Sequence, residues 1–387
     1  MEICERDKCT GCFACKNICP KEAIAVETDE LGKTVPEILK EKCVECGLCR
    51  KVCPELGKKN LTFPIKCYAM WTKDKKDREE CASGGVATGI SHYFIANGGV
   101  VFGTDWNKGN ELELEIKMAE TEGEMEHFKT SKYVQAFTGD SYKRAKQQLV
   151  QGRQVLYVGT PCQIAGLKGY LQKEYENLTT IDLICHGTPP IEYLRTYVKE
   201  LFPNKRVVKA SFRGKDDYCL KFFENGNVNP IYSKMHILDL YFSAFLKGLT
   251  FRDNCYMCEY ARNERVSDIT IGDFWGIDRS TLKRKYEGKI SVVLINTDKG
   301  KKTLEQCRDK FYMEERQIEE AIEGNDQLRK PSVLHKDYEK FREVYTQKGF
   351  SKAVKSTRIK KEIFISSIKQ STWGLMAKKT IRKLIRL

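Results

Sequence analysis

The sequence predicts a small cysteine-rich α+β domain, then a larger α/β domain, and last a basic amphipathic helical tail. Three observations predict this organisation. Nine of the 17 cysteines fall within the first 53 residues, strand and helix signals alternate from Cys67 onward, and the last 37 residues are strongly basic. Hydrophobic residues make up 41% and charged residues 31% of the 387, which suits globular domains and excludes collagen-like, largely disordered and membrane-spanning proteins.

The cysteines near the N-terminus follow a repeated spacing. Eight of the nine form two copies of the pattern Cys-x2-Cys-x2-Cys-x3-Cys-Pro, and they are Cys9, Cys12, Cys15, Cys19, Cys43, Cys46, Cys49 and Cys53. This is the spacing of bacterial two-cluster ferredoxins, in which the fourth cysteine of each run ligates the other cluster. The pattern predicts one [4Fe–4S] cluster on Cys9, Cys12, Cys15 and Cys53, and a second on Cys43, Cys46, Cys49 and Cys19. Two zinc sites are the alternative, but they leave the third cysteine and the Cys-Pro pair of each run unexplained.

Two short apolar segments lie between the cysteine runs. Residues 23–26 and 34–38 flank a polar turn at 29–32, an arrangement that is typical of a β-hairpin. Together with the cysteine loops, the hairpin predicts an α+β ferredoxin-like domain over residues 1–62.

The larger domain is expected to begin with a strand at 65–71 and a charged loop at 73–80. Ser83 is expected to cap a helix that ends near Asn97, before a strand at 100–103. The Ser-Gly-Gly start of this helix offers free backbone N–H groups to a phosphate. An ordinary helix cap is the alternative, and by itself the motif favours that interpretation.

A strand–helix–strand unit follows, with strands expected at 154–158 and 179–184. One cysteine falls just past the end of each strand, at the sheet edge where open α/β sheets bind ligands. A Cys-x2-Cys pair lies in a polar turn further on. Each of these cysteines alone is more often a buried structural thiol. Together the four can hold a third [4Fe–4S] cluster, and they are Cys162, Cys185, Cys255 and Cys258. The remaining cysteines are expected to be packing residues: Cys4, Cys67, Cys81, Cys219 and Cys307.

Six ordered motifs between about Cys67 and Asn296 resemble the beta subunit of coenzyme F420-reducing hydrogenase and the related dehydrogenases. They are Ser83–Val86, Ser131–Gln135, Val158–Leu167, Cys185–Gly187, Ser211–Lys215, and Cys255-x2-Cys258 followed by Ser267–Gly276. The resemblance implies that residues 63–150 and 151–325 are the N-terminal and C-terminal parts of this family's domain. The ferredoxin-like unit is then a fusion in front of it, and residues 326–387 are a basic helical tail.

The resemblance further implies a flavoprotein, with FAD beside the third cluster. The residues expected to contact FAD are Ser83, Gly84, Gly85, Lys132, Tyr133, Gln135, Gly159, Thr160 and Pro161. In that order, the first three would meet the diphosphate, the next three would lie near the isoalloxazine, and the last three would line the same crevice. The candidate catalytic residues are Lys132, Tyr133 and His186. His186 would relay a proton to the reduced flavin, or alternatively cap a strand end.

These parts predict an oxidoreductase, because clusters carry single electrons, organic acceptors take hydride pairs, and a flavin converts between them. We expect electrons to pass between a ferredoxin or redox partner subunit, the clusters and FAD, and a small-molecule hydride acceptor such as coenzyme F420. Two alternatives stay open. One is an electron-transfer subunit that feeds a partner enzyme, for example in polysaccharide biosynthesis. The other is a zinc-bound interaction or nucleic-acid-binding protein. No Gly-x-Gly-x-x-Gly fingerprint marks a separate NAD domain.

Most of the positive charge lies near the C-terminus. Residues 351–387 contain eleven Lys or Arg and one acidic residue, a net +10 of the chain's +14. At helical spacing, apolar and basic side chains over 377–386 fall on opposite faces, which is typical of a helix that binds an anionic membrane surface or an acidic partner. A solvated, partly disordered tail is the alternative. Because the first residues lack an apolar export signal, we expect a cytoplasmic location, peripheral at the inner face of the membrane, and no nucleic-acid partner.

Overall fold

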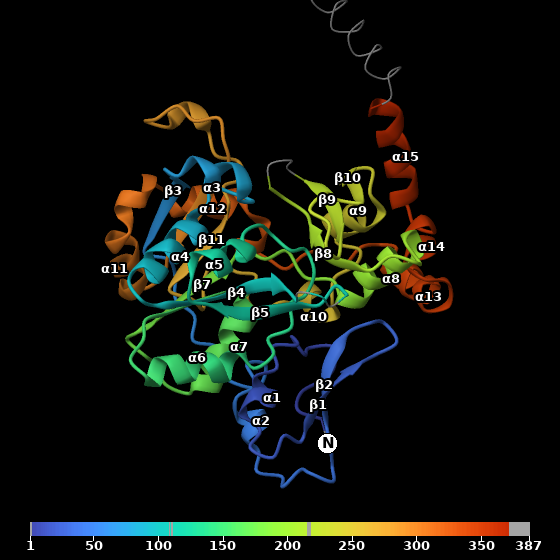
Figure 1. Cartoon of the computed structure of the whole chain (residues 1–387), viewed down its shortest axis with the longest axis horizontal. Coiled ribbons are helices and arrows are strands. Elements are labelled where there is room, and N and C mark those ends of the chain that lie inside the picture. Colours follow the sequence, from blue (N-terminus) through green and yellow to red (C-terminus); the bar gives the residue numbers. More distant parts are fainter. Residues whose placement is uncertain (1, 108, 110, 215–217, 371–387) are drawn as a thin grey trace, which may run out of the picture.

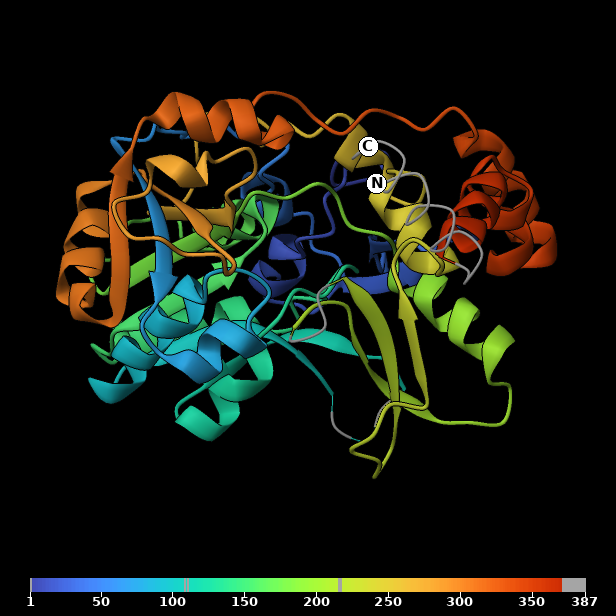
Figure 2. The ribbon, with the colours of Figure 1, turned by 90° about the horizontal axis from the view of Figure 1, so that it is seen from above.

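The computed structural model describes residues 2–107, 109, 111–214 and 218–370. They form a small N-terminal domain, a large mixed sheet with helices on both faces, and a three-stranded sheet flanked by helices (Figure 1). The large sheet and the three-stranded sheet lie side by side, as Figure 2 also shows. This architecture confirms the predicted α/β class of the larger domain.

The N-terminal domain contains the predicted hairpin. β1 (Ile24–Thr28) pairs antiparallel with β2 (Thr34–Ile38). The two short helices α1 (Ala14–Ile18) and α2 (Leu48–Lys51) lie within the two cysteine runs and pack together. α1 ends where it does because Cys19 precedes Pro20, and a residue before proline favours the extended conformation that Cys19 adopts.

The described part of the large sheet has the strand order β13-β3-β12-β11-β7-β6-β4-β5. The strands are β3 (Lys66–Thr72), β4 (Val100–Trp106), β5 (Leu114–Ala119), β6 (Val155–Gly159), β7 (Leu178–Leu183), β11 (Ile269–Asp273), β12 (Ser291–Ile295) and β13 (Phe311–Arg316). β4, β6, β7 and β11 run parallel to one another, and β3 has the same direction because it is antiparallel to β12. The carboxyl ends of these five strands therefore meet at one edge of the sheet.

Helices cover both faces because alternate residues of the strands point to opposite sides. Val100 and Phe102 pack in one core with α6 and α7, whereas Val101 packs in a second core with α4 and α11. The helices around this sheet are α3 (Lys75–Glu80), α4 (Val86–Ala96), α5 (Glu122–Met125), α6 (Ser141–Val150), α7 (Pro161–Leu171), α11 (Asp298–Gln306) and α12 (Ile318–Gly324), with short 3-10 turns at Glu126–Phe128, Arg279–Thr281, Arg308–Lys310 and Asp326–Leu328.

Two local expectations near the start of this domain are wrong. The charged stretch after β3 is not a loop, because Asp74 caps it and its carboxylate accepts from the Asp77 N–H at 2.8 Å, which supports α3. Ser83 does not cap α4. The cap residue is Gly85, whose φ of 77° favours glycine, and the Ser83 hydroxyl instead donates to the Ile290 carbonyl at 3.3 Å.

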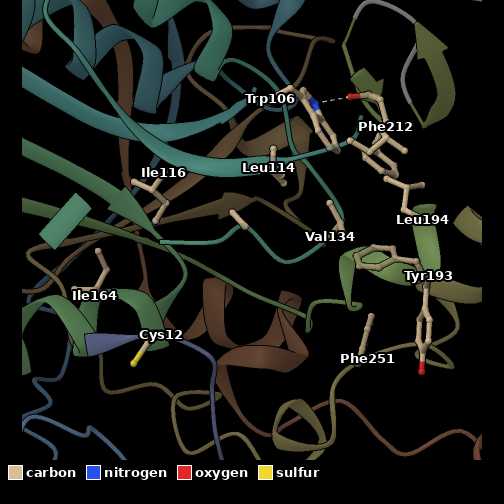
Figure 3. Packing of buried hydrophobic residues seen from close by; sticks show 14 of the residues in the cluster. Cys12, Trp106, Leu114, Ile116, Val134, Ile164, Tyr193, Leu194, Phe212 and Phe251 are labelled. Carbon is tan, nitrogen blue, oxygen red and sulfur yellow. Dashed lines mark hydrogen bonds between the residues drawn. The ribbon is translucent and has the colours of Figure 1, made fainter. Parts of the chain in front are cut away.

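The three-stranded sheet is joined to the large sheet through an aromatic core. Trp106 at the end of β4 donates its indole N–H to the Ala210 carbonyl at 3.0 Å, a bond that Figure 3 shows beside Phe212. The elements on this side are α8 (Ile191–Leu201), β8 (Val207–Ser211), β9 (Cys219–Glu224), β10 (Tyr232–Met235), α9 (Leu240–Leu246) and α10 (Asp253–Tyr256). Tyr241 and Phe350, whose ring centroids lie 5.5 Å apart, are fully buried in this core.

From Tyr338 onward the described part of the expected tail is largely helical, and its first helices belong to this core. α13 (Tyr338–Lys348), α14 (Phe350–Lys355) and α15 (Ile359–Gln370) follow one another, and Phe341, Val354 and Ile359 are fully buried. Among the residues that the structure describes, no helix is long and apolar enough to cross a membrane. The basic amphipathic helix expected over 377–386 lies outside the described residues.

Candidate metal centres

The first predicted ligand set is gathered at one place in the N-terminal domain. Cys9, Cys12, Cys15 and Cys53 line a single small cavity, so the last cysteine of the second run lies with the first three of the first run. Burial raises the pKa of the Cys12 thiol to about 12. A group of buried thiolates therefore needs a nearby positive charge, which bound iron supplies.

The second predicted set lies closer to solvent. Burial raises the pKa of the Cys49 thiol, and the nearby thiols of Cys43 and Cys46 raise it further. Cys46 is exposed. α1, which ends one residue before Cys19, packs against α2, which carries Cys49. The second set is thus the outer of the two in this domain.

The third predicted set is assembled from three separate segments. β6 leads into α7 and Cys162, the neighbouring parallel strand β7 ends two residues before Cys185, and α10 carries Cys255. The thiols of Cys185, Cys255 and Cys258 are all close enough to Cys162 to raise its pKa further, after burial has raised it. The ends of β6 and β7 and the segment that starts at α10 therefore bring these four side chains near one another.

The surroundings of this third set suit a metal cluster. Burial raises the pKa of Cys185 to about 12 and that of Cys258 to about 11, so free thiolates are disfavoured here. At the same time the Thr160 hydroxyl lies 3.2 Å from the Cys162 sulfur, and polar groups of Gly187 and Thr188 oppose the rise in the pKa of Cys185 and of Cys255. Hydrogen bonds to sulfur are a usual feature of iron–sulfur sites. These donors and the four thiols fit a [4Fe–4S] cluster.

The other five cysteines mostly pack. Cys67, Cys81 and Cys307 are buried, and Cys219 is partly exposed with its thiol 3.3 Å from the Ser233 hydroxyl. Cys4 is different, since it lines the cavity of the first set, and its thiol hydrogen-bonds with the thiols of Cys9 and Cys53.

Arg252 joins the first set to the third. Its guanidinium donates to the Cys9 carbonyl at 3.1 Å, to the Thr34 carbonyl at 3.2 Å and to the Gln135 side-chain oxygen at 2.6 Å. The side chain is 1% exposed. Burial raises the pKa of Cys255, three residues further on, and the charge of Arg252 opposes that rise. The buried Arg252 guanidinium therefore contacts the first cysteine loop and also opposes the rise in the pKa of a cysteine in the third set.

Close packing surrounds this junction of the two domains. The Thr138 hydroxyl donates to the Cys12 carbonyl at 2.9 Å, and Lys33 pairs with Asp253 at 2.5 Å. Figure 3 shows Cys12 below Ile164 of α7, at the border of the large core. Gly11 has a φ of 64°, and a Cβ at this position would lie 2.5 Å from the Gln135 amide nitrogen. Only glycine fits there.

The structure separates Gln135 from the other residues expected near the flavin. Its amide nitrogen donates to the Thr10 carbonyl at 3.3 Å, and its oxygen accepts from Arg252. The side chain of Gln135 therefore faces the N-terminal domain, whereas the remaining expected residues lie along the carboxyl edge of the large sheet.

Lys132 is held by the backbone at this edge. Its ammonium nitrogen lies 2.9 to 3.1 Å from four carbonyl oxygens, which belong to Thr104, His127, Phe128 and Lys129. Burial lowers the pKa of Lys132 to about 7, while the four acceptors favour the protonated form. Lys132 thus fixes the segment before Tyr133 against the end of β4.

Tyr133 lies in an aromatic group, stacked on Phe245 with ring centroids 4.4 Å apart. Burial raises the pKa of its hydroxyl, which hydrogen-bonds with Arg213. Arg213 is 5% exposed and donates to the Asp273 carboxylate at 2.5 Å, at the end of β11. The Arg213–Asp273 pair connects Tyr133 to the middle of the sheet edge.

The start of α4 lies at the β3 end of the same edge. Gly84 donates its N–H to the Ser291 hydroxyl at 2.9 Å and accepts from the Thr72 N–H at 2.8 Å. No side chain among the described residues caps the first N–H groups of α4, which suits an anionic group. A Cβ on Gly84 would lie 2.4 Å from the Met70 carbonyl, so the chain requires glycine here.

The segment 159–161 and His186 lie at the ends of β6 and β7. Gly159 ends β6, and Pro161 is the first residue of α7. Between them, the Thr160 backbone N–H and hydroxyl both donate to the Gln163 side-chain oxygen at 3.0 Å. The Thr160 hydroxyl also lies 3.2 Å from the Cys162 sulfur. His186 has an exposed side chain, and its carbonyl accepts from the Ser332 hydroxyl at 2.5 Å.

Together the cysteine sets and the sheet edge define an iron–sulfur protein of the electron-transfer class. Residues 8–56 match the 4Fe-4S dicluster domain, and residues 152–321 match the C terminus of the coenzyme F420 hydrogenase/dehydrogenase beta subunit. The expected resemblance to that family, with a ferredoxin-type unit in front, is thereby confirmed.

Solved structures and curated proteins were compared as well. A chain of the xenon-derivatised F420-reducing [NiFe] hydrogenase complex from Methanosarcina barkeri is 16% identical, with a TM-score of 0.46. The match covers 78% of this chain and 94% of that chain. No curated protein matches this sequence.

Sequence reasoning missed Arg252 as a functional residue and gave Arg213 no role of its own. Arg252 stands in a turn between Phe251 and Asp253, just before the cysteine pair. A charged residue beside predicted ligands was the available signal, but its partners lie more than 200 positions away in the N-terminal domain.

Proposed function

We propose that this protein is an iron–sulfur flavoprotein oxidoreductase. It passes electrons between its ferredoxin-type clusters and FAD, and exchanges hydride with a small organic acceptor such as coenzyme F420. When bound, the clusters supply single-electron transfer, and FAD supplies the conversion to hydride pairs. The observation that supports the proposal is the gathering of two predicted ligand sets beside Arg252: Cys9, Cys12, Cys15 and Cys53 line one cavity, and Cys162, Cys185, Cys255 and Cys258 lie near one another.

The burial of the three sets supports an order for the path. The second set, with the exposed Cys46, is the one that an external ferredoxin or partner subunit reaches. The first set is buried beside Arg252, and the third lies across the junction at the sheet edge. The electron path would therefore run from the surface of the N-terminal domain through the first set to the third set at the sheet edge.

The sheet edge supplies the groups that FAD requires. The uncapped N–H groups at the start of α4, next to Ser83, Gly84 and Gly85, suit the diphosphate. Lys132 and Tyr133 order the segment on which the isoalloxazine would rest. The segment 159–161 adjoins Cys162 and would keep the flavin beside the third set. His186, next to Cys185, would move a proton to or from the flavin.

Gln135 has a different role in this proposal. Because its side chain bonds Arg252 and the Thr10 carbonyl, it holds the first cysteine loop rather than the flavin.

Anaerobic turnover tests the function. The purified chain is reduced with a low-potential viologen, and oxidised coenzyme F420 is added while its absorbance is followed. Loss of that absorbance only with intact clusters supports the proposal. Reduction of the bound clusters and flavin without turnover of F420, or of any acceptor in a screen of quinones and nicotinamides, favours a subunit that feeds a partner enzyme.

A further inference from the structure

Tyr260 carries a buried hydroxyl that the protein leaves unpaired. The residue is 3% exposed, and among the described residues the hydroxyl has no hydrogen-bond partner. Buried hydroxyl groups nearly always have a partner, since water is no longer available to them. An unpaired hydroxyl therefore indicates a partner that the polypeptide itself does not provide.

Tyr260 packs where the first and third cysteine sets meet. It shares one buried core with Cys12, and Cys162, Cys255 and Cys258 pack against that core. Tyr260 also follows Cys258 by only two positions, and the next residue, Ala261, donates its N–H to the Cys258 carbonyl at 3.2 Å. Burial raises the pKa of the Tyr260 hydroxyl most, followed by the charges of Glu55, Cys162, Cys12 and Cys258. No hydrogen bond joins the hydroxyl to Glu55.

Two neighbouring tyrosines show what the usual arrangement is. The Tyr142 hydroxyl, also near Cys12 and Cys162, donates to the Gln163 carbonyl at 2.8 Å. The Tyr256 hydroxyl donates to the Gly248 carbonyl at 2.7 Å. Both hydroxyl groups have a protein acceptor, that of Tyr142 buried and that of Tyr256 partly buried, whereas the Tyr260 hydroxyl has none among the described residues.

We propose that the Tyr260 hydroxyl donates a hydrogen bond to a sulfur of the cluster held by Cys162, Cys185, Cys255 and Cys258. This inference rests on the proposed function, because it requires that cluster. Its effect is on the reduction potential. Reduction adds negative charge to a cluster, and a hydrogen bond to its sulfur stabilises that charge, so the potential rises. Tyr260 is a positioning residue that keeps the third cluster able to accept electrons from the first.

The test is an anaerobic redox titration of Tyr260→Phe, followed by electron paramagnetic resonance. The signal of the third cluster is identified by its absence from Cys255→Ser. Tyr142→Phe is the matched control, because its hydroxyl is equally buried but already has the Gln163 acceptor. We expect Tyr260→Phe to keep the wild-type iron content and to lower the midpoint potential of the third cluster alone. Tyr142→Phe should leave that potential unchanged.

A second variant covers the case in which Tyr260→Phe loses iron. Replacement of Tyr260 by 3-fluorotyrosine keeps the hydroxyl but makes it a stronger donor, so the third-cluster potential should rise. Unchanged potentials in an iron-replete variant overturn the inference and leave the proposed function standing. A shift in the first cluster instead also overturns it. A wild-type chain without any third-cluster signal overturns the proposed third cluster, and the inference with it.

Discussion

Arg252 holds the two domains together, and its replacement by methionine tests this directly. The guanidinium donates to three partly buried acceptors, the Cys9 and Thr34 carbonyls and the Gln135 amide oxygen. Methionine fills much of the same space but leaves all three without this donor. Each unpaired buried acceptor costs roughly 1 to 3 kcal/mol. The low end of that range, taken for all three, gives a loss of about 3 kcal/mol.

This loss corresponds to a shift of the docking equilibrium by about a hundredfold. The assay is limited trypsin digestion under anaerobic conditions, with cleavage followed at Lys58, an exposed residue in the segment that joins the domains. When opening is fast, the cleavage rate follows the population of the opened state. The matched control is Arg262→Met, because Arg262 is half exposed and pairs only locally with Glu264 among the contacts described. Equal cleavage rates for the two variants would refute the reasoning.

The remaining predictions concern one ligand, one ion-pair network and the C-terminal segment. Cys53→Ala should lose about four iron atoms per chain, as measured by iron analysis. The control is Cys307→Ala, which changes a buried packing residue and should keep the wild-type iron content. Equal iron contents in the two variants would contradict the crossed ligand pattern. The hydrogen bond to Asp77 raises the pKa of His92 in the folded protein. Protonated His92 therefore stabilises the fold below about pH 6.5, and this stabilisation is lost as the pH rises through the folded-state pKa of His92. His92→Asn should therefore lower the thermal midpoint more at about pH 6 than at about pH 9, and an equal loss at both would count against the assignment. A chain that ends at Gln370 keeps the buried residues of α13 and α14 but lacks the amphipathic helix expected over 377–386. It should fail to float with anionic liposomes that carry the full chain, and equal flotation would exclude residues 377–386 as the anchor.

Much of the fold could be predicted because it depends on local signals. The hairpin of β1 and β2 follows from two apolar runs around a polar turn, and its residues lie within a single stretch of 15. The ends of β6 and β7 carry Cys162 and Cys185, and this placement follows from strand signals alone. Spacing likewise assigned Cys53 to the first set, because the crossed pattern belongs to the motif itself.

The failures involve contacts that are distant in sequence. Ser83 is a good cap residue, but its hydroxyl donates to the Ile290 carbonyl, 207 positions away, and Gly85 takes the cap position with its positive φ. The bonds of Gln135 with Arg252 and the Thr10 carbonyl, 117 and 125 positions away, carry no local signal either, and its expected place near the flavin stays a prediction. A lone arginine or tyrosine carries no periodic signal, so Arg252 and Tyr260 gain their significance only when the two domains are packed together.

The central claim is that three clusters and one flavin share this chain. Iron and flavin determination on anaerobically purified protein tests it most directly, with Cys255→Ser measured beside the wild type. The account predicts about twelve iron atoms and one flavin per wild-type chain, and about eight iron atoms in the variant. Eight iron atoms in both, with no flavin in the wild type, would contradict it.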